Sequence, residues 1–280
     1  MTAPTVVDPS SAAEAVREPG LGTVFAAAVR AEWTKLRTVR STMWSLLVAV
    51  AIIIGLGALF CAARVSRWDR FDAAELRRFD PTAFSLNGLF LAQLAIGVLG
   101  VLVITSEYAT GQIRATLGAT PQRTLVLAAK VLVFTAVTFV VGLVACFAAF
   151  FIGQSIFSAK HAQASLGDPD VLRAVVGGAL YLSVLGALGI GLGAIFRRTA
   201  GAIAALVGML LILPVLAGFL PSPWNDDVSK YLPGQAGGEI FRVVARSSNS
   251  LSPWTGFAVF VAYAVVSLVI GAVLLAKRDA

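Results

Sequence analysis

Residues 175–196 read VVGGALYLSVLGALGIGLGAIF, a run without a single Asp, Glu, Lys or Arg. A helix needs about 20 mostly apolar residues to cross the roughly 30 Å hydrocarbon core of a bilayer. The run meets that length. It also contains six glycines, and small residues let helix backbones approach closely where lipid supplies no hydrophobic drive. We expect these glycines to serve packing, with a flexible hinge as the alternative.

Five other stretches meet the same test, so the fold class is predicted to be all-α, a polytopic membrane protein with six transmembrane helices. The composition agrees, because 58% of the 280 residues are hydrophobic and only 13% are charged, against about 25% charged in soluble domains. Pro214 is expected to kink the fifth span, and Lys130, near the start of the third, to snorkel to the interface. The six predicted spans are Met43–Ala63, Phe84–Ile104, Leu125–Ile152, Val175–Phe196, Ala200–Leu220 and Thr255–Ala276.

The domain organisation follows from these runs. Residues 1–20 are polar and interrupted by prolines, and they lack the apolar core of a cleavable signal. We interpret them as a disordered cytoplasmic tail, followed by one six-helix membrane domain over residues 21–280.

The positive charges indicate an orientation. An even number of spans puts both termini on one side, and Lys and Arg in short loops near span ends favour the cytoplasm. Arg197 and Arg198 occupy the short turn after the fourth span, and Lys277 follows the last. The arginines of the first loop, residues 64–78, argue the other way but alternate with acidic residues. Both termini are therefore predicted to be cytoplasmic, and the net charge of +7 is attributed to this bias and not to nucleic-acid binding.

An amphipathic segment, Gly22–Arg40, precedes the first span. Its apolar residues recur at helical spacing and its basic residues fall off that stripe, which is typical of a helix lying in the membrane interface. Glu32, at the edge of the apolar stripe, makes the pattern imperfect. The alternative is an early, kinked start of the first span. The residues assigned to this interfacial elbow helix are Phe25, Arg30, Trp33, Lys35 and Arg37.

The loop between the second and third spans, Thr105–Thr124, reads TSEYATGQIRATLGATPQRT. It predicts a helix from about Ser106 to Leu117, a stop at Gly118, and a restart at Thr120-Pro121, where Thr suits an N-cap and Pro the first helical position. A capped helix of this kind favours a docking element, although a plain linker is the alternative. In the last loop, residues 221–253, a short amphipathic helix is expected over Gly238–Arg246.

Several classes of chemistry are excluded. No ionisable residue lies at mid-depth of a span, as ion-coupled carriers usually need, and Gln93 and Gln154 are the strongest polar groups there. No phosphate-binding loop is present, and Cys61 and Cys146 lie in apolar runs as expected of packing residues. No catalytic, cofactor or metal residue is therefore assigned, and the chain is not expected to be an enzyme. Uphill movement of a substrate would need energy from another polypeptide.

Three stretches carry a family resemblance. RAEWTKLRTVRST (residues 30–42), the block from Ser106 to Lys130, and YLPGQAG (residues 231–237) resemble membrane subunits of actinobacterial ATP-binding-cassette type-2 transporters. The second block has the recurrent E…G…L…P…K spacing of that family. The residues that match this spacing are Glu107, Gly111, Leu117, Pro121 and Lys130.

The resemblance implies the permease subunit of an ATP-driven exporter in a bacterial plasma membrane. Two such subunits, identical or different, would pair with two cytoplasmic ATPase subunits, which would bind the ATP. It also implies a coupling helix at about Ser106–Leu117. A non-transporting membrane scaffold or sensor partner is the alternative function, and an ATP-independent channel or carrier is a third; the cargo is not readable. The residues implied in ATPase docking are Glu107, Tyr108, Gly111, Arg114 and Leu117.

Overall fold

The computed structural model describes residues 20–77, 79–119, 122–222, 224–247 and 249–277. The predicted N-terminal tail lies outside the described residues, apart from Gly20.

Within these residues, six helical segments are long and apolar enough to cross a membrane, which confirms the predicted fold class. No strand occurs in the described part of the chain. Each observed segment begins or ends within a few residues of the predicted one, because apolar run length sets the span. The six are α2 (Arg40–Ser66), α5 (Leu89–Ala109), α7 (Arg123–Phe157), α8 (Val171–Phe196), α9 (Thr199–Val207) with its continuation, and α13 (Pro253–Lys277).

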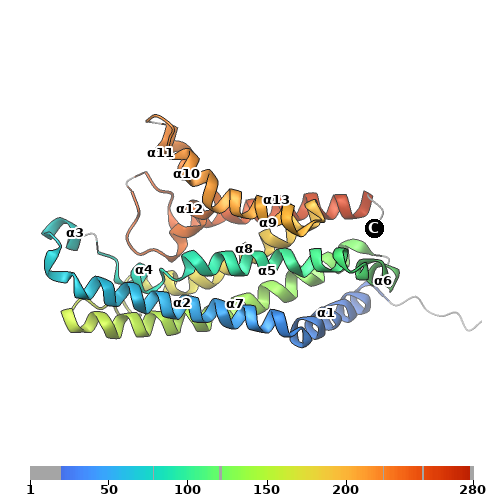
Figure 1. Ribbon diagram of the computed structural model, residues 1–280, viewed down its shortest axis with the longest axis horizontal. Coiled ribbons are helices and arrows are strands. Elements are labelled where there is room, and N and C mark those ends of the chain that lie inside the picture. Colours follow the sequence, from blue (N-terminus) through green and yellow to red (C-terminus); the bar gives the residue numbers. More distant parts are fainter. Residues whose placement is uncertain (1–19, 78, 120–121, 223, 248, 278–280) are drawn as a thin grey trace, which may run out of the picture.

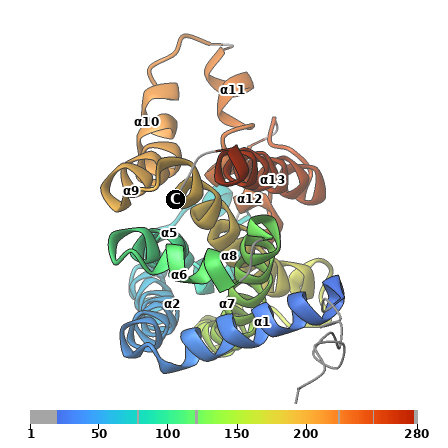
Figure 2. The same ribbon diagram turned by 90° about the vertical axis from the view of Figure 1, so that its right-hand side faces the viewer.

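Helix α8 forms the centre of the bundle, packed against α5, α7 and α13 (Figure 2). Five of its glycines lie at these contacts, and Gly177 meets Ile240. A Cβ atom on Gly189 would come within 2.5 Å of the Gly97 carbonyl oxygen, and one on Gly177 within 2.5 Å of the Ile240 carbonyl oxygen. The helix runs unbroken through all six glycines. This arrangement agrees with the packing interpretation of residues 175–196.

The fifth span changes helix type in its middle. Helix α9 passes into a π-helical turn, η4 (Gly208–Ile212), and then into α10 (Leu213–Ala217), with Pro214 in its first turn. A proline donates no backbone hydrogen bond, so the regular α-helical ladder is disturbed next to it. Close to Pro214, where a kink was predicted, the span therefore forms a π-helical turn that ends at Ile212. Beyond it, α10 and α11 (Trp224–Ser229) rise away from the bundle (Figures 1 and 2).

Short elements gather at the end of the bundle that carries α11. They are η2 (Trp68–Arg70), α3 (Ala73–Arg77), α4 (Pro81–Ser85), η3 (Ser158–Lys160), α12 (Pro233–Gly238) and η5 (Glu239–Phe241).

The predicted helix over Gly238–Arg246 is wrong in its placement. The chain is helical from Pro233 to Phe241, and residues 242–246 are not helical. Pro233 starts the helix early, since its fixed φ suits a first turn. The Asp80 carboxylate then holds the following backbone in a loop, accepting hydrogen bonds from the N–H groups of Val243 and Val244 at 2.8 and 2.9 Å.

The opposite end, called the α6 end here, carries α1 (Leu21–Thr38), α6 (Gln112–Ala119) and the end of α13 (Figure 1). Helix α1 matches the predicted elbow helix closely. The single extended residue Val39, with ψ of 103°, separates it from α2. The elbow is therefore a helix of its own, set at an angle to the first span (Figure 1).

Candidate functional site

The candidate site is the corner at which α5 turns into α6. Helix α5 ends at Ala109, and Gly111 adopts a left-handed conformation with φ of 72°. Glycine takes this conformation without the steric cost that a Cβ atom brings. The turn at Gly111 sends the chain into α6.

The predicted boundaries of the coupling helix are therefore wrong. Residues 106–109 belong to the end of α5, and the separate helix is Gln112–Ala119. Gly118, predicted to stop the helix, lies inside it, while Thr120 and Pro121 lie outside the described residues. Helical hydrogen bonding of α5 continues past the apolar run until a residue with positive φ ends it, and composition alone does not reveal that point.

Directly behind this corner lies a cluster of four charged side chains, here called the ion network. It consists of Glu32 and Lys35 of α1, Glu107 of α5 and Lys130 of α7. The Lys130 ammonium group lies 2.6 Å from Glu107 Oε1 and 2.9 Å from Glu32 Oε2. The Lys35 ammonium group lies 2.8 Å from Glu107 Oε1 and 2.9 Å from Glu32 Oε1. Each lysine therefore bridges both carboxylates, and three helices meet at one charge-balanced cluster.

The ion network is buried. The side chains of Lys130, Glu107 and Glu32 are 1%, 6% and 9% exposed, and that of Lys35 is 32% exposed. Charges in such a position are tolerated only when they are paired, because the desolvation of each ion costs several kcal/mol. Burial lowers the pKa of Lys35, but its hydrogen bonds with Glu107 and Glu32 outweigh that effect and raise it overall. Lys35 therefore stays charged at neutral pH.

The ion network corrects the sequence-based expectations for Lys130 and Glu107. Lys130 does not snorkel to the interface but points into the bundle, because two carboxylates meet it there. Glu107 lies in the interior and not on the exposed face of the corner, so any effect on a partner passes through its neighbours. Glu32, the flaw in the apolar stripe of α1, is the buried residue of that helix. Two features of the sequence point to this pair. Glu32 is an acid on an apolar stripe, and Lys130 is a lysine in an apolar run.

The other candidate docking residues lie around the network. Tyr108 is half-buried, and the Arg197 guanidinium group lies over its ring at 5.3 Å from the centroid. Arg197 also donates a hydrogen bond to the Leu274 carbonyl oxygen at 3.0 Å. Tyr108 therefore connects the corner to the turn after α8. Arg114 and Leu117 both lie on α6, but their side chains are outside the described part of the structure.

The candidate elbow residues divide by exposure. Lys35 belongs to the ion network and Phe25 is half-buried, whereas Arg30, Trp33 and Arg37 are exposed. This division matches a helix that lies on the bundle with Arg30 and Arg37 outward and Lys35 inward.

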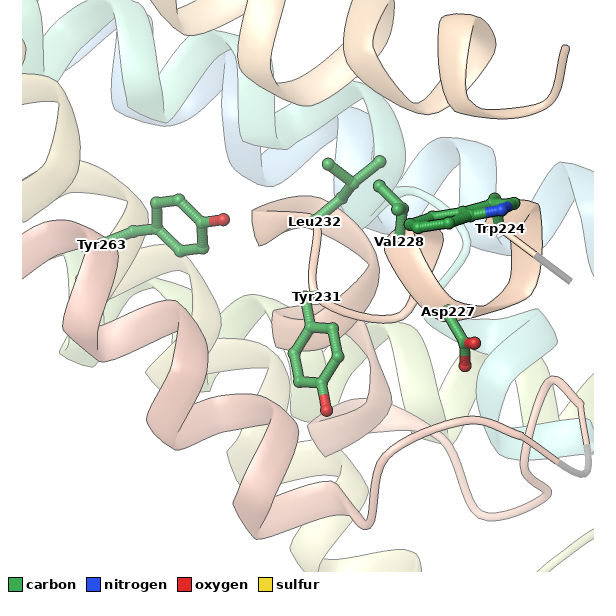
Figure 3. Close-up of a pocket in the computed structure, with 6 residues that line it drawn as sticks. All are labelled: Trp224, Asp227, Val228, Tyr231, Leu232 and Tyr263. Carbon is green, nitrogen blue, oxygen red and sulfur yellow. The ribbon is translucent and has the colours of Figure 1, made fainter. Parts of the chain in front are cut away.

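A separate hollow of about 460 Å³ lies between α11 and α13 (Figure 3). Tyr263 points from α13 toward Leu232, and Trp224 and Tyr231 add two further aromatic rings (Figure 3). Asp227, the one carboxylate among the described residues of the lining, pairs with Lys230 at 2.9 Å. Hydrogen bonds from Lys230 and Asn249 lower the Asp227 pKa. The hollow therefore presents aromatic surface and a neutralised acid.

Two comparisons with known proteins bear on the site. A protein-family model described as "ABC-2 family transporter protein" matches residues 28–211, more than half of the chain. The matched region runs from α1 into η4 and so includes the ion network and the α5–α6 corner. A search of curated proteins finds no match.

Proposed function

We propose, from the premise that the chain belongs to the ABC-2 transporter protein family, that an ATPase docks on its α5–α6 corner and drives export. Family membership makes the chain a membrane permease subunit of an ABC transporter. The identity of the motor, its docking place and the direction of transport are the proposal. The ATP would be bound by the motor subunit, since no phosphate-binding loop is present in this sequence.

The observation that carries the proposal is the ion network behind the corner. A force on α6 reaches α5 through the short turn at Gly111, and Glu107 stands within the last turn of α5. Its carboxylate binds lysines from α1 and α7 at 2.8 and 2.6 Å. Separating one partner from a buried ion pair costs about 3–5 kcal/mol. Movement of the corner is therefore expected to carry α1 and α7 with it.

The charge distribution supports a cytoplasmic location for the corner. Arg197, Arg198 and Lys277 lie at the α6 end, close to the ends of spans. Lys and Arg at such positions favour the cytoplasmic side. We therefore place the α6 end in the cytoplasm of a bacterial cell, where an ATPase would meet it.

A second permease chain completes the proposal. Helix α10 leaves the bundle with most of its side chains uncovered, among them Leu213, Val215 and Leu216 at 42%, 62% and 55% exposed, and Phe219, just after the helix, is 81% exposed. An apolar surface of this kind suits contact with lipid or with another subunit. We propose that two permease chains enclose the export path between them.

The test is site-specific photo-crosslinking in a strain that co-expresses the chain with candidate ATPase subunits. A photoreactive amino acid replaces Gln112, the exposed first residue of α6, and in a matched control it replaces Asp170, exposed at the other end of the bundle. Capture from position 112, but not 170, of a protein whose peptides contain a GxxxxGK[ST] loop is expected. Equal capture from both positions, or copurification of the ATPase without capture at 112, would contradict docking on α6.

A further inference from the structure

A groove of about 510 Å³ runs beneath the elbow helix, between α1, the first turns of α2, and α7. Trp33 and Leu36 form one wall, Met43 and Leu46 a second, and Val137 belongs to the third. Arg37 is the one charged residue among the described residues that line it. The groove is therefore apolar, with one cationic side chain at its edge. Its volume lies in the range of small-molecule sites, roughly 300–1,000 Å³.

The groove lies where lipid is the surrounding solvent. Helices α2 and α7 are membrane spans, and α1 crosses their ends at an angle (Figure 1). The lining residues Met43, Leu132 and Val140 are exposed on these two spans, so the groove opens onto their outer faces. Water is an unfavourable occupant for an apolar surface of this kind. An acyl chain has the matching chemistry.

The charges around the groove indicate the headgroup. Arg30, Arg37 and Arg40 are exposed, and no ion pair to them occurs among the described residues. The only acidic residue of α1, Glu32, is turned into the bundle and bonded to two lysines. Helix α2 contains no acidic residue at all. The rim is therefore positive without compensation, and basic side chains in this setting attract anionic lipid.

We infer that the groove binds one anionic glycerophospholipid, with an acyl chain against α7 and the phosphate at Arg37. Of the three arginines, Arg37 is the one that lines the groove. This binding is independent of ATPase docking on α6, because none of the described residues that line the groove belongs to α6 or to the ion network. Residues 1–19 contain three acidic residues and are the alternative binding partner for these arginines. The experiment must therefore distinguish them from lipid.

The test uses Trp33 as the reporter, since its ring lines the groove and is half-exposed. The other four tryptophans are replaced by phenylalanine, and the protein is placed in vesicles of phosphatidylcholine and phosphatidylglycerol. One of the two lipids carries bromine on its chains, which quenches indole fluorescence on contact. At equal mole fraction, brominated phosphatidylglycerol is expected to quench Trp33 with an apparent affinity about fivefold higher than brominated phosphatidylcholine, the factor for one basic side chain facing anionic lipid.

Two variants separate headgroup from chain. Arg37→Gln is expected to remove the preference for phosphatidylglycerol, while Arg70→Gln, an exposed arginine at the other end of the bundle, leaves it intact. Ala136→Leu fills the groove and is expected to reduce quenching by both lipids. Ala128→Leu, at an alanine of α7 that is also exposed and is not among the lining residues, serves as its control.

Three results would overturn the inference. One is an unchanged lipid preference in Arg37→Gln, and another is unchanged quenching in Ala136→Leu, since the chain would then lie outside the groove. The third is a preference that emerges only after residues 1–19 are deleted, because those residues would then occupy the arginines in the full chain.

Discussion

Each end of the bundle buries a carboxylate that ties together segments distant in sequence, but the partners differ. At the α6 end, the carboxylates of the ion network bind lysine side chains from neighbouring helices. At the other end, Asp80 binds backbone N–H groups, those of Ala83 at the start of α4 and of Val243 and Val244 after η5, at 2.8–2.9 Å. We call this second arrangement the Asp80 clasp.

The difference lies in how much each arrangement can move. Backbone donors have fixed positions, so the Asp80 clasp holds one geometry or breaks. Lysine side chains have several rotatable bonds and, in the ion network, each serves two carboxylates, so their pairing can shift while the charges stay neutralised. The clasp suits a fixed connection at the end of the bundle that carries α11, and the ion network suits a connection that transmits movement.

The largest expected effect is that of Lys130→Met. The substitution keeps most of the side-chain volume but leaves Glu32 and Glu107 with Lys35 as their only ammonium partner in the network. An uncompensated buried charge costs about 3–5 kcal/mol. We expect a loss of this size in the free energy of unfolding, measured by denaturation in lipid nanodiscs. Lys160→Met, which removes a pair whose Asp69 partner is 86% exposed, should cost under about 1 kcal/mol. Equal losses in both variants would contradict a structural role for the network.

Breaking the Asp80 clasp should cost less. Asp80→Ala leaves the N–H groups of Val243, Val244 and Ala83 without the acceptor they now share. Hydrogen bonds to a charged group contribute about 1.5–3 kcal/mol, and water at this end of the bundle can replace part of the loss. We expect a decrease of about 2–3 kcal/mol, together with faster proteolysis between residues 242 and 252.

Asp69→Ala provides the control for the clasp, since its carboxylate is exposed and bonded only to Lys160 in the described structure. It should leave proteolysis of that loop unchanged. Protection of the loop in Asp80→Ala equal to that in the parent protein would show that the clasp is dispensable.

A smaller effect is expected from pH, through Lys35. Its pKa is raised in the folded state, so its contribution to stability is complete below the unfolded pKa, about 10.4, and is lost as pH rises through the folded value. The stability difference between the parent and Lys35→Gln should therefore be constant from pH 7 to 9 and shrink above pH 10.5. Thermal unfolding of both proteins across that range measures it. A stability difference between the two proteins that grows with pH would contradict a raised pKa for Lys35.

The smallest effect is expected for Glu239→Gln. Glu239 lies near the Asp80 clasp and is 5% exposed, and burial raises the pKa of its carboxyl group, an effect that Arg242 partly opposes. Because the charged form is disfavoured in the folded protein, a neutral isostere should change the free energy of unfolding by less than about 1 kcal/mol. Chemical denaturation at pH 7 measures the change. A loss as large as that of Asp80→Ala would mean that the Glu239 charge holds the loop after η5.

Sequence reasoning reached the bundle because span length depends on local composition alone. The helical spacing of apolar residues also predicted α1 as a separate helix, and the glycines of residues 175–196 indicated close packing. The ion network was not predicted, since its members lie as far apart as Glu32 and Lys130, and nothing local states that they meet. For the same reason the partner of Asp80, a backbone segment more than 160 residues away, could not be read from a pattern.

The corner was predicted in kind but not in detail. A helix between the second and third spans was expected, and α6 is that helix, yet Gly111 and not Gly118 marks the break. Glycine is compatible both with a helix interior and with a left-handed turn. Which of two glycines takes the turn depends on how far α5 must extend for Glu107 to reach its lysines, and that is a tertiary requirement.

The π-helical turn η4 has a consequence for length variation in this chain. A π turn holds one more residue than an α turn, so deletion of one residue within 208–212 would let the segment wind as a plain α-helix and leave α9 and α10 facing as they do now. The same deletion in α8 would rotate all later residues by about 100° and swing its glycines away from α5. Related chains that are one residue shorter or longer in their spans should therefore carry that deletion or insertion in the fifth span.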